Sequence, residues 1–253
     1  MYEPKKILVI GAAGLLGISV TKELLMRGNT VIASDLDCKM IAGGLADLEY
    51  YQENKMLNME SLNITSEKSL SNVFSKYADI SGVVNCSYPK NQNYGREFFK
   101  VDVHDFNENI SLNLGSSFLL MKQCAAHFKN YPKNFSLVNI GSIYGVVAPR
   151  FDIYKDTEMT MPVEYAAIKS ALIHLSKYVV KYVKDSRFRI NTVSLGGLID
   201  KQDTKFLENY KEYTLGKGML ENSDAIGAIC FLLSDESLYI NGQNIIVDDG
   251  FTL

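Results

Sequence analysis

Short apolar runs alternate with amphipathic segments along the chain. A strand that is covered on both faces reads as a continuous apolar run, and a helix shows apolar residues every three or four positions. The expected strands are 5–10, 30–34, 55–63, 82–85, 135–140, 189–195 and 243–247. The expected helices are 15–26, a weaker segment at 39–50, 65–77, one or two helices within 98–128, 163–183 and 224–233.

This order of elements predicts an α/β fold. We expect a doubly wound, mostly parallel sheet of about seven strands with helices on both faces, the Rossmann arrangement. The pattern shows no internal repeat, low-complexity tract or linker, so residues 1–253 are expected to form a single domain.

Composition and charge narrow the class of protein. The chain has 253 residues, of which 47% are hydrophobic and 22% charged, as in an ordinary globular domain. A net charge of −3 offers no basic surface for a phosphate backbone, so we expect neither nucleic acid nor an acidic membrane as partner.

The cysteines and the start of the chain predict a compartment. Cys38, Cys86, Cys124 and Cys230 lie far apart and read as reduced thiols, not as a disulfide framework or a zinc site. Met1–Lys6 leads directly into a strand and leaves no room for a signal peptide. No apolar run approaches the roughly 20 residues that span a bilayer. We therefore expect a soluble cytoplasmic protein.

A glycine-rich turn follows the first strand. Gly11, Gly14 and Gly17 open the first helix, where glycine permits a tight turn and a close approach of the backbone to a pyrophosphate. The spacing GxxGxxG differs from the commoner GxGxxG, and a tight turn without a ligand is the alternative interpretation. The position after the first strand favours a dinucleotide site.

The second strand ends at an acidic residue. Asp35 lies about 20 residues beyond the glycines, where a carboxylate can bind the ribose hydroxyls of adenosine. A carboxylate there repels a 2′-phosphate, and no arginine follows, so NAD is favoured over NADP. A solvated loop acid is the alternative.

Tyr165 and Lys169 carry the candidate chemistry. A spacing of four residues places them on one face of the helix expected at 163–183. An ammonium nearby, together with the positive nicotinamide of an oxidised cofactor, is expected to lower the tyrosine pKa and make the phenol an acid–base group. A solvated helix face is the alternative, which the upstream glycine turn disfavours.

With these motifs the chain resembles the short-chain dehydrogenase/reductase family over its whole length. The resemblance implies Ser142, in the run 138–142, as hydrogen-bond partner of the substrate oxygen, and Asn113 as the residue that holds a water of the proton relay. It implies hydride transfer between nicotinamide C4 and a carbinol or carbonyl carbon. Lys169 would bind ribose as well as tune Tyr165.

The resemblance also implies the residues that contact the cofactor. The run 85–88 stands where the family often has Asn-Asn-Ala-Gly, and 195–197 stands in for the Pro-Gly turn beside the nicotinamide. The implied cofactor-binding residues are Gly11, Ala13, Gly14, Leu15, Leu16, Gly17, Asp35, Leu36, Asn63, Ile64, Asn85, Cys86, Ser87, Tyr165, Lys169, Leu195, Gly196 and Gly197.

The chain departs from the family pattern at several positions. Leu15 replaces a glycine, Asn63 stands where an Asp often contacts adenine, and Ser87 replaces the alanine of Asn-Asn-Ala-Gly. The interval between Ser142 and Tyr165 is about ten residues longer than the family's classical branch prefers. These departures weaken the implied cofactor contacts more than the implied chemistry.

Two segments are expected to form substrate loops, around 146–162 and 196–222. In the first, Arg150 and Lys155 offer phosphate ligands, and a plain surface loop is an equal alternative. The runs 142–149 and 239–244 resemble a branch of the family that serves flagellin glycosylation in bacteria. That resemblance implies a role in making nonulosonic-acid sugars, with a sugar or sugar phosphate as substrate.

Other residues are expected to have no chemical role. His104, His127 and His174 form no recognisable metal motif, so we expect no metal site. Tyr178 and Tyr182 lie one helical turn apart and suit either a core stripe or a subunit interface. The family resemblance implies a homodimer or homotetramer.

An NAD(H)-dependent oxidoreductase acting on a sugar-like substrate is the leading hypothesis. A nucleotide-sugar epimerase or dehydratase that retains NAD shares the same Ser, Tyr and Lys, but such enzymes usually carry a larger C-terminal substrate region than the stretch that follows Leu198. A dinucleotide sensor without activity is disfavoured because Ser142, Tyr165 and Lys169 are all present.

Overall fold

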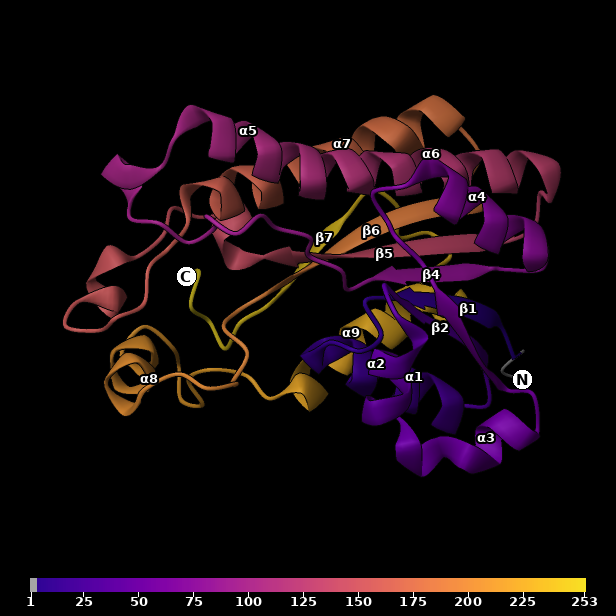
Figure 1. Cartoon of the computed structure of the whole chain (residues 1–253), viewed down its shortest axis with the longest axis horizontal. Helices are drawn as coiled ribbons and strands as arrows, with labels where there is room; N and C mark the ends of the chain where they lie inside the picture. The colour runs from indigo at the N-terminus through magenta and orange to yellow at the C-terminus, as the bar shows by residue number, and fades with distance from the viewer. Residues whose placement is uncertain (1–3) are drawn as a thin grey trace.

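One parallel sheet organises the structure, which is a computed structural model describing residues 4–253. Its seven strands run in the order β3-β2-β1-β4-β5-β6-β7, and every neighbouring pair is parallel (Figure 1). The strands are β1 (Lys6–Ile10), β2 (Thr30–Asp35), β3 (Leu57–Ser61), β4 (Gly82–Asn85), β5 (Phe135–Ser142), β6 (Phe188–Leu195) and β7 (Asn244–Val247). The predicted parallel sheet is confirmed.

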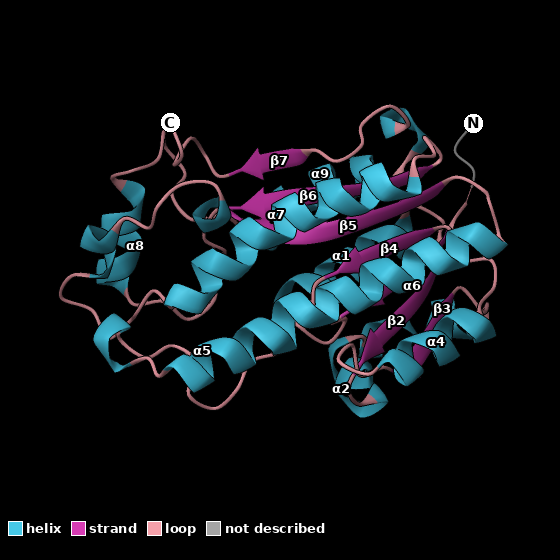
Figure 2. Ribbon diagram, turned by 90° about the horizontal axis from the view of Figure 1, so that it is seen from above, coloured by secondary structure: helices cyan, strands magenta, loops and turns pink. Residues whose placement is uncertain are grey.

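Helices cover both faces of this sheet. The α-helices are α1 (Leu15–Met26), α2 (Cys38–Gly44), α3 (Glu49–Glu53), α4 (Glu67–Lys76), α5 (Val103–Ile110), α6 (Ser116–Asn130), α7 (Val163–Val183), α8 (Thr204–Lys211) and α9 (Asn222–Leu233). Helices α4, α6 and α7 lie on one face, and α1, α2 and α9 lie on the other (Figures 1 and 2). The doubly wound Rossmann arrangement is therefore confirmed.

Strand β1, which is paired on both sides, shows why apolar runs become strands here. Ile7 and Val9 point into the core beneath α1 and α9, while Leu8 and Ile10 point into the core beneath α4, α6 and α7. All four side chains are buried. The four buried residues thus alternate between two cores, whereas Lys6 at the start of the strand is only half-buried and pairs with Asp79.

Several helix boundaries differ from the sequence-based expectation. The segment expected as one weak helix at 39–50 is divided into α2, a 3₁₀ turn and α3, since Gly43 and Gly44 favour an early end. The stretch 98–128 contains α5 and most of α6, which ends two residues later, and the two are joined by a turn of π-helix at Ser111–Gly115. Helix α8 was not anticipated, because its apolar residues face a small cluster away from the sheet.

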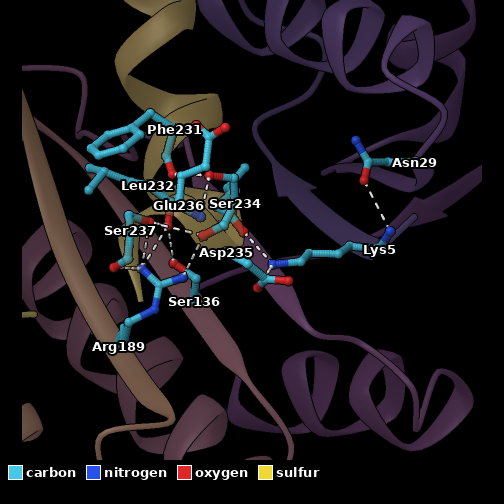
Figure 3. Close-up of polar contacts among 11 residues, drawn as sticks. Lys5, Asn29, Ser136, Arg189, Phe231, Leu232, Ser234, Asp235, Glu236 and Ser237 are labelled. Atoms are coloured by element: carbon cyan, nitrogen blue, oxygen red, sulfur yellow. Dashed lines mark hydrogen bonds and ion pairs between the residues drawn. The ribbon is translucent and has the colours of Figure 1, made fainter. Parts of the chain in front are cut away.

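A buried arginine closes the C-terminal end of α9. Arg189 of β6 is 1% exposed, and its guanidinium donates to the carbonyls of Leu232, Ser234 and Ser237 (Figure 3). Leu232 lies in the last turn of α9 and Ser234 is its C-cap, so their carbonyls have no partner inside the helix and the cation satisfies them. The Ser237 carbonyl belongs to the 3₁₀ turn that follows. Lys5 adds a bond to the Leu233 carbonyl at 2.8 Å and ties the first strand to the same helix end.

The sheet order creates a crevice at the C-terminal ends of β1 and β4. The chain continues from β1 outward to β2 and β3, then returns to place β4 on the other side of β1. Ile10 is therefore paired with Asn85, and the turns that follow these strands lie opposite each other. Ligands of open α/β sheets bind at such a switch point.

Residues 4–253 contain no helix that is long and apolar enough to cross a membrane. All four cysteines are free. The expectation that no signal peptide precedes the first strand rests partly on residues 1–3, which lie outside the described residues.

Candidate functional site

The three glycines after β1 have different roles in the turn. Gly11 has a φ of +80°, and a Cβ there would lie 2.8 Å from the Ser87 nitrogen. A Cβ on Gly17 would lie 2.0 Å from the Gly11 carbonyl oxygen, so this glycine lets helix α1 pack against its own entry turn. Gly14 is the N-cap of α1 and supplies no side-chain cap, which leaves the first backbone N–H groups open to a ligand.

A cavity of about 500 Å³ opens beside this turn, and we call it the glycine-turn cavity. Its walls come from the C-terminal ends of β1, β2, β3 and β4. The lining residues are Ile10, Gly11, Ala13, Gly14, Asp35, Leu36, Met40, Leu62, Asn63, Ile64, Thr65, Cys86, Ser87, Tyr88 and Pro89. The predicted residues Leu15, Gly17 and Asn85 are not among them, although Gly17 shapes the turn.

Asp35 is fixed at the end of β2 by the backbone. Its carboxylate accepts hydrogen bonds from Ala13 N at 3.0 Å and from Leu36 N at 2.8 Å. The acid is thus held against the glycine turn, and it keeps lone pairs directed to the cavity that it lines. Asn63, at the opposite wall, uses its side-chain oxygen to accept from Thr65 N and Oγ1, which leaves its NH₂ group as the free donor.

A second cavity of about 360 Å³ adjoins the first, and we call it the tyrosine cavity. Cys86, Ser87 and Tyr88 line both. The other lining residues are Leu16, Ile140, Gly141, Ser142, Ile143, Tyr144, Tyr154, Met159, Met161, Tyr165, Lys169, Leu195, Gly196, Gly197, Leu198, Gln202, Phe206, Tyr210 and Met219.

The tyrosine cavity brings Ser142, Tyr165 and Lys169 together. Ser142 is the last residue of β5, whereas Tyr165 and Lys169 lie on the first two turns of α7. The Lys169 ammonium donates to the Ile140 carbonyl at 2.7 Å and lies 5.5 Å from the centre of the Tyr165 ring. A hydroxyl, a phenol and an ammonium on neighbouring elements can polarise an oxygen and exchange a proton with it.

Burial sets the protonation of these groups. Burial raises the pKa of Tyr165, and its hydrogen bond with Ser142 acts in the opposite direction. Burial lowers the pKa of Lys169 to about 8, against an opposing effect of Cys86. In the chain alone the Tyr165 pKa is therefore raised, opposite to the expected lowering, because desolvation outweighs the hydrogen bond. That expectation also invoked the positive charge of an oxidised cofactor.

The residues beside the lysine are similarly desolvated. Burial raises the pKa of Cys86 to about 12, which leaves its thiol neutral near pH 7. Asn85 lies behind this position, and its side-chain oxygen accepts from Ser87 Oγ at 2.7 Å. Asn85 therefore shapes the shared wall without lining either cavity.

Asn113 lies in the π-helical turn between α5 and α6 and is buried. Its carbonyl accepts from the hydroxyls of Ser116 and Ser117, at 3.0 and 2.9 Å. Its amide nitrogen has no partner among the described residues. The structure does not place Asn113 on the wall of either cavity, so its predicted role in holding a water stays a prediction.

The turn after β6 forms the far wall of the tyrosine cavity. Leu195, Gly196 and Gly197 line it, and Gly197 N donates to the Tyr210 hydroxyl at 2.8 Å. A Cβ on Gly196 would lie 2.9 Å from that same hydroxyl. The small residues thus allow α8 to approach the sheet.

Sequence reasoning missed most of the aromatic wall of this cavity. Tyr144, Tyr154, Phe206 and Tyr210 come from segments far apart in the chain, and no motif connects them. They nevertheless fall within or beside the loops expected at 146–162 and 196–222. The available signal was the number of aromatic and methionine residues in those loops.

Arg150 lies outside both cavities. Its guanidinium lies 4.7 Å from the Tyr213 ring centre and 5.5 Å from that of Phe251, and it donates to the Phe251 carbonyl. Lys155 is exposed and does not line either cavity. This arrangement favours the surface-loop interpretation of the two residues over phosphate binding.

One cluster of metal-ligand side chains occurs within residues 4–253. His104, Asp105 and Glu108 bring ligand atoms within 4.8 Å of one another, a proximity that the sequence analysis did not note. Asp105 accepts from the Arg96 guanidinium at 3.2 Å and from the Asn91 and Asn93 amides. A cation already neutralises this carboxylate, so the cluster does not point to a metal.

Comparisons with known proteins agree with this geometry. A family model described as enoyl-(acyl carrier protein) reductase matches residues 11–252. A post-translational flagellin modification protein A from Campylobacter coli is 34% identical over 258 residues, covering 100% of both chains. A 7alpha-hydroxysteroid dehydrogenase from Bacteroides fragilis is 27% identical over 266 residues, covering 100% of this chain and 96% of the relative.

A solved structure is similar over nearly the same extent. The short-chain dehydrogenase of Leptospira borgpetersenii, crystallised with bound NAD+, superimposes with a TM-score of 0.86 and 28% identity. The match covers 100% of this chain and 94% of the other.

Proposed function

The chain belongs to the short-chain dehydrogenase/reductase family, and from this premise we propose that it is an NAD(H)-dependent oxidoreductase of a sugar-like substrate. One observation carries the proposal. The glycine-turn cavity and the tyrosine cavity share a wall, so a dinucleotide in the first would extend to Ser142, Tyr165 and Lys169 in the second.

The glycine turn fits a dinucleotide. At Gly11 and Gly17 a Cβ would fill the space that the tight turn needs, and the N-terminus of α1 offers unpaired N–H groups to a pyrophosphate. Asp35 would accept hydrogen bonds from the adenosine ribose, and its negative charge supports NAD over NADP. When bound, the nicotinamide supplies or accepts the hydride.

The protein's own groups would handle the proton. Tyr165 would donate its phenolic proton to a carbonyl oxygen, or take the proton of a carbinol in the reverse direction. Ser142 would donate a hydrogen bond to the same oxygen. Lys169, which stays mainly protonated below its pKa of about 8, would contact ribose and stabilise negative charge on the phenol.

The substrate proposal rests on the relative and on the cavity. The Campylobacter coli relative is named for flagellin modification, which supports a role in making nonulosonic-acid sugars. Tyr144, Tyr154 and Tyr210 offer ring faces for the C–H side of a sugar and hydroxyls for its oxygens. A flat alicyclic alcohol is the second candidate, favoured by the apolar lining and by the hydroxysteroid dehydrogenase relative.

The test follows NADH absorbance with sugars, sugar phosphates, nucleotide sugars and hydroxysteroids, each in parallel with Tyr165→Phe. We expect turnover with one class, loss in the variant and weaker activity with NADP. Sugar conversion seen by NMR without net NADH change would replace this proposal with an epimerase or dehydratase that retains NAD. No NADH binding by the wild-type protein would contradict it outright.

We also propose a homodimer, or a tetramer of such dimers, that works in the cytoplasm. Phe118 of α6 and Tyr178 and Tyr182 of α7 are 48%, 65% and 80% exposed and border one groove of about 710 Å³. An exposed apolar surface of this kind suits a second copy of the chain. Sedimentation should show an oligomer that Tyr178→Asp with Tyr182→Asp dissociates; a monomeric wild-type protein would contradict this.

A further inference from the structure

The segment that follows β4 is the wall between the two cavities. Cys86, Ser87 and Tyr88 line both, and Tyr88 is the largest of the three. The family run Asn-Asn-Ala-Gly has a glycine at the place of Tyr88. The chain therefore carries a bulky ring at the junction of the two cavities, at a place where the family run has no side chain.

The Tyr88 ring packs on the catalytic candidates. Its centre lies 5.4 Å from that of the Tyr165 ring, with the two planes tilted by 55°. The Lys169 ammonium lies 5.0 Å from the Tyr88 ring centre, slightly closer than its 5.5 Å to Tyr165. A cation within about 6 Å of a ring is attracted to its face. One side chain thus contacts both the phenol and the ammonium.

A polar network holds the segment in place from the other side. The Tyr88 and Tyr94 hydroxyls lie 3.1 Å apart, and Asn91 N donates to Asn109 of α5 at 2.9 Å. Asn91 also donates to Asp105, which accepts from Arg96 as well. The segment 88–96 is therefore bonded to α5 at both its middle and its end.

This network ends on the catalytic helix. Asn109 donates to the carboxylate of Glu164 at 3.1 Å, and Glu164 is the residue before Tyr165. Glu164 is fully buried, and its second carboxylate oxygen has no partner among the described residues. A buried carboxylate oxygen without a hydrogen-bond partner costs free energy. The start of α7 and the segment 88–96 are thus coupled through α5.

We propose that Tyr88 is a positioning residue for the reaction, whose ring orients the Tyr165 phenol and shields the Lys169 ammonium from water. The role in turnover rests on the proposed function, whereas the shielding is a property of the chain alone. The network from Asn91 to Glu164 fixes the ring relative to α7.

Shielding has a measurable consequence. The titratable groups that face Lys169 are Cys86 and Tyr88 from the shared wall and Tyr165 from its own helix. Among the causes acting on the lysine, burial is the largest, and it lowers the pKa. Removal of the Tyr88 ring admits water, which favours the charged form, so the Lys169 pKa should rise toward its ordinary value.

The first experiment titrates isotope-labelled lysine side chains by NMR in the cofactor-free protein. Lys169→Arg identifies the Lys169 signal by its loss. We expect Tyr88→Ala to raise the Lys169 pKa by about one unit or more, and Tyr88→Phe, which keeps the ring, to leave it near the wild-type value. Tyr239→Ala is the matched control, because Tyr239 is 97% exposed and lines neither cavity.

An unchanged Lys169 pKa in Tyr88→Ala would overturn the shielding. If Tyr88→Ala fails to fold, Asn91→Ala replaces it, since it loosens the segment with the ring intact and should raise the pKa in the same direction. An unchanged pKa in a folded Asn91→Ala would then contradict the proposal.

The second experiment compares steady-state kinetics of the same variants. We expect Tyr88→Ala to lower kcat on the order of tenfold or more with a smaller change in KM, because the reacting groups are misplaced. Tyr88→Phe should restore most of kcat. Equal loss in both variants would assign the effect to the hydroxyl and contradict the role of the ring. A wild-type protein without turnover would contradict the proposed function, while the NMR titration would still decide the shielding.

Discussion

The two cavities are built in different ways. The glycine-turn cavity is shaped mainly by backbone, at the ends of four neighbouring strands, and its key positions are defined by the absence of a side chain. The tyrosine cavity is shaped by large side chains from β5, α7, α8 and the loops between them. Added atoms should therefore damage the first cavity, and removed atoms should damage the second.

The largest effect is expected from removal of one oxygen in the tyrosine cavity. Tyr165→Phe should lower kcat by about 10²- to 10⁴-fold, the usual contribution of a general acid or base, with NADH binding retained. Tyr239→Phe is the control, because it removes a hydroxyl from a tyrosine that is 97% exposed and lines neither cavity. Equal losses in the two variants, measured by NADH absorbance, would remove Tyr165 from its assigned role.

The next largest effect is expected from adding a methyl group to the glycine turn. Gly17→Ala should lower the free energy of unfolding by about 3 kcal/mol or more and weaken NADH binding, because the new Cβ meets the Gly11 carbonyl. Gly227→Ala in α9 is the control. A Cβ there meets nothing within 4 Å, so it should stabilise the protein by up to about 1 kcal/mol. Denaturant unfolding of both variants measures these changes in the free energy of unfolding. An unchanged free energy of unfolding in Gly17→Ala would contradict the packing argument.

Lys169→Met should stabilise the protein as it inactivates it. The pKa of Lys169 falls from an ordinary 10.5 to about 8 in the folded chain, so at pH 7 the fold carries a desolvated charge. We expect a gain of up to about 3 kcal/mol at pH 7, since one pKa unit corresponds to about 1.4 kcal/mol.

The gain should shrink as the pH rises through 8 toward 10.5. In that window the unfolded wild-type chain binds more protons than the folded chain, so the wild-type protein becomes more stable with pH. Thermal unfolding at pH 7 and pH 9.5 measures this difference, with the exposed Lys181→Met as control. A stabilisation by Lys169→Met that increases with pH would contradict the lowered pKa of Lys169.

The smallest effect concerns the one charged side chain of the glycine-turn cavity. Asp35→Asn should reduce the preference for NAD over NADP by about tenfold, because the charge is lost while one acceptor oxygen remains. Asp37→Asn, two residues further on and bonded to Lys39 N, should leave the preference unchanged. Binding of NADH and NADPH, followed by their fluorescence, measures the ratio. An unchanged ratio in Asp35→Asn would mean that another residue selects the cofactor.

The same contrast explains how far the sequence could be interpreted. The first elements along the chain and the glycine turn are local patterns: β1, the turn and α1 follow one another, so periodicity and spacing predicted them. Tyr165 and Lys169 are four residues apart on one helix and were predicted for the same reason. The family resemblance placed Ser142 beside them, and its family assignment is confirmed.

The site residues that were not predicted depend on contacts between segments that are far apart in the sequence. Tyr88 became important only when the fold brought it against Tyr165, and Tyr210 only when α8 packed under the turn after β6. The raised pKa of Tyr165 in the chain alone was also not predicted, because burial cannot be inferred from a YxxxK spacing. The lowering expected from the lysine together with an oxidised cofactor stays a prediction. Sequence patterns therefore predict the glycine-turn cavity, which is shaped by backbone. The aromatic wall of the tyrosine cavity depends on tertiary packing and could not be predicted in this way.

The π-helical turn at Ser111–Gly115 has a further consequence for how this fold tolerates changes in length. Each residue of a helix advances the helical phase by about 100°, and a π turn accommodates one residue more than an α turn. Helix α5 must present Asp105 and Asn109 to the segment 88–96, while α6 must face the sheet. Deletion of a single residue here would rotate the two helices out of register, although every chemical group would remain. Among relatives, the length of this turn is therefore expected to vary less than its amino-acid composition.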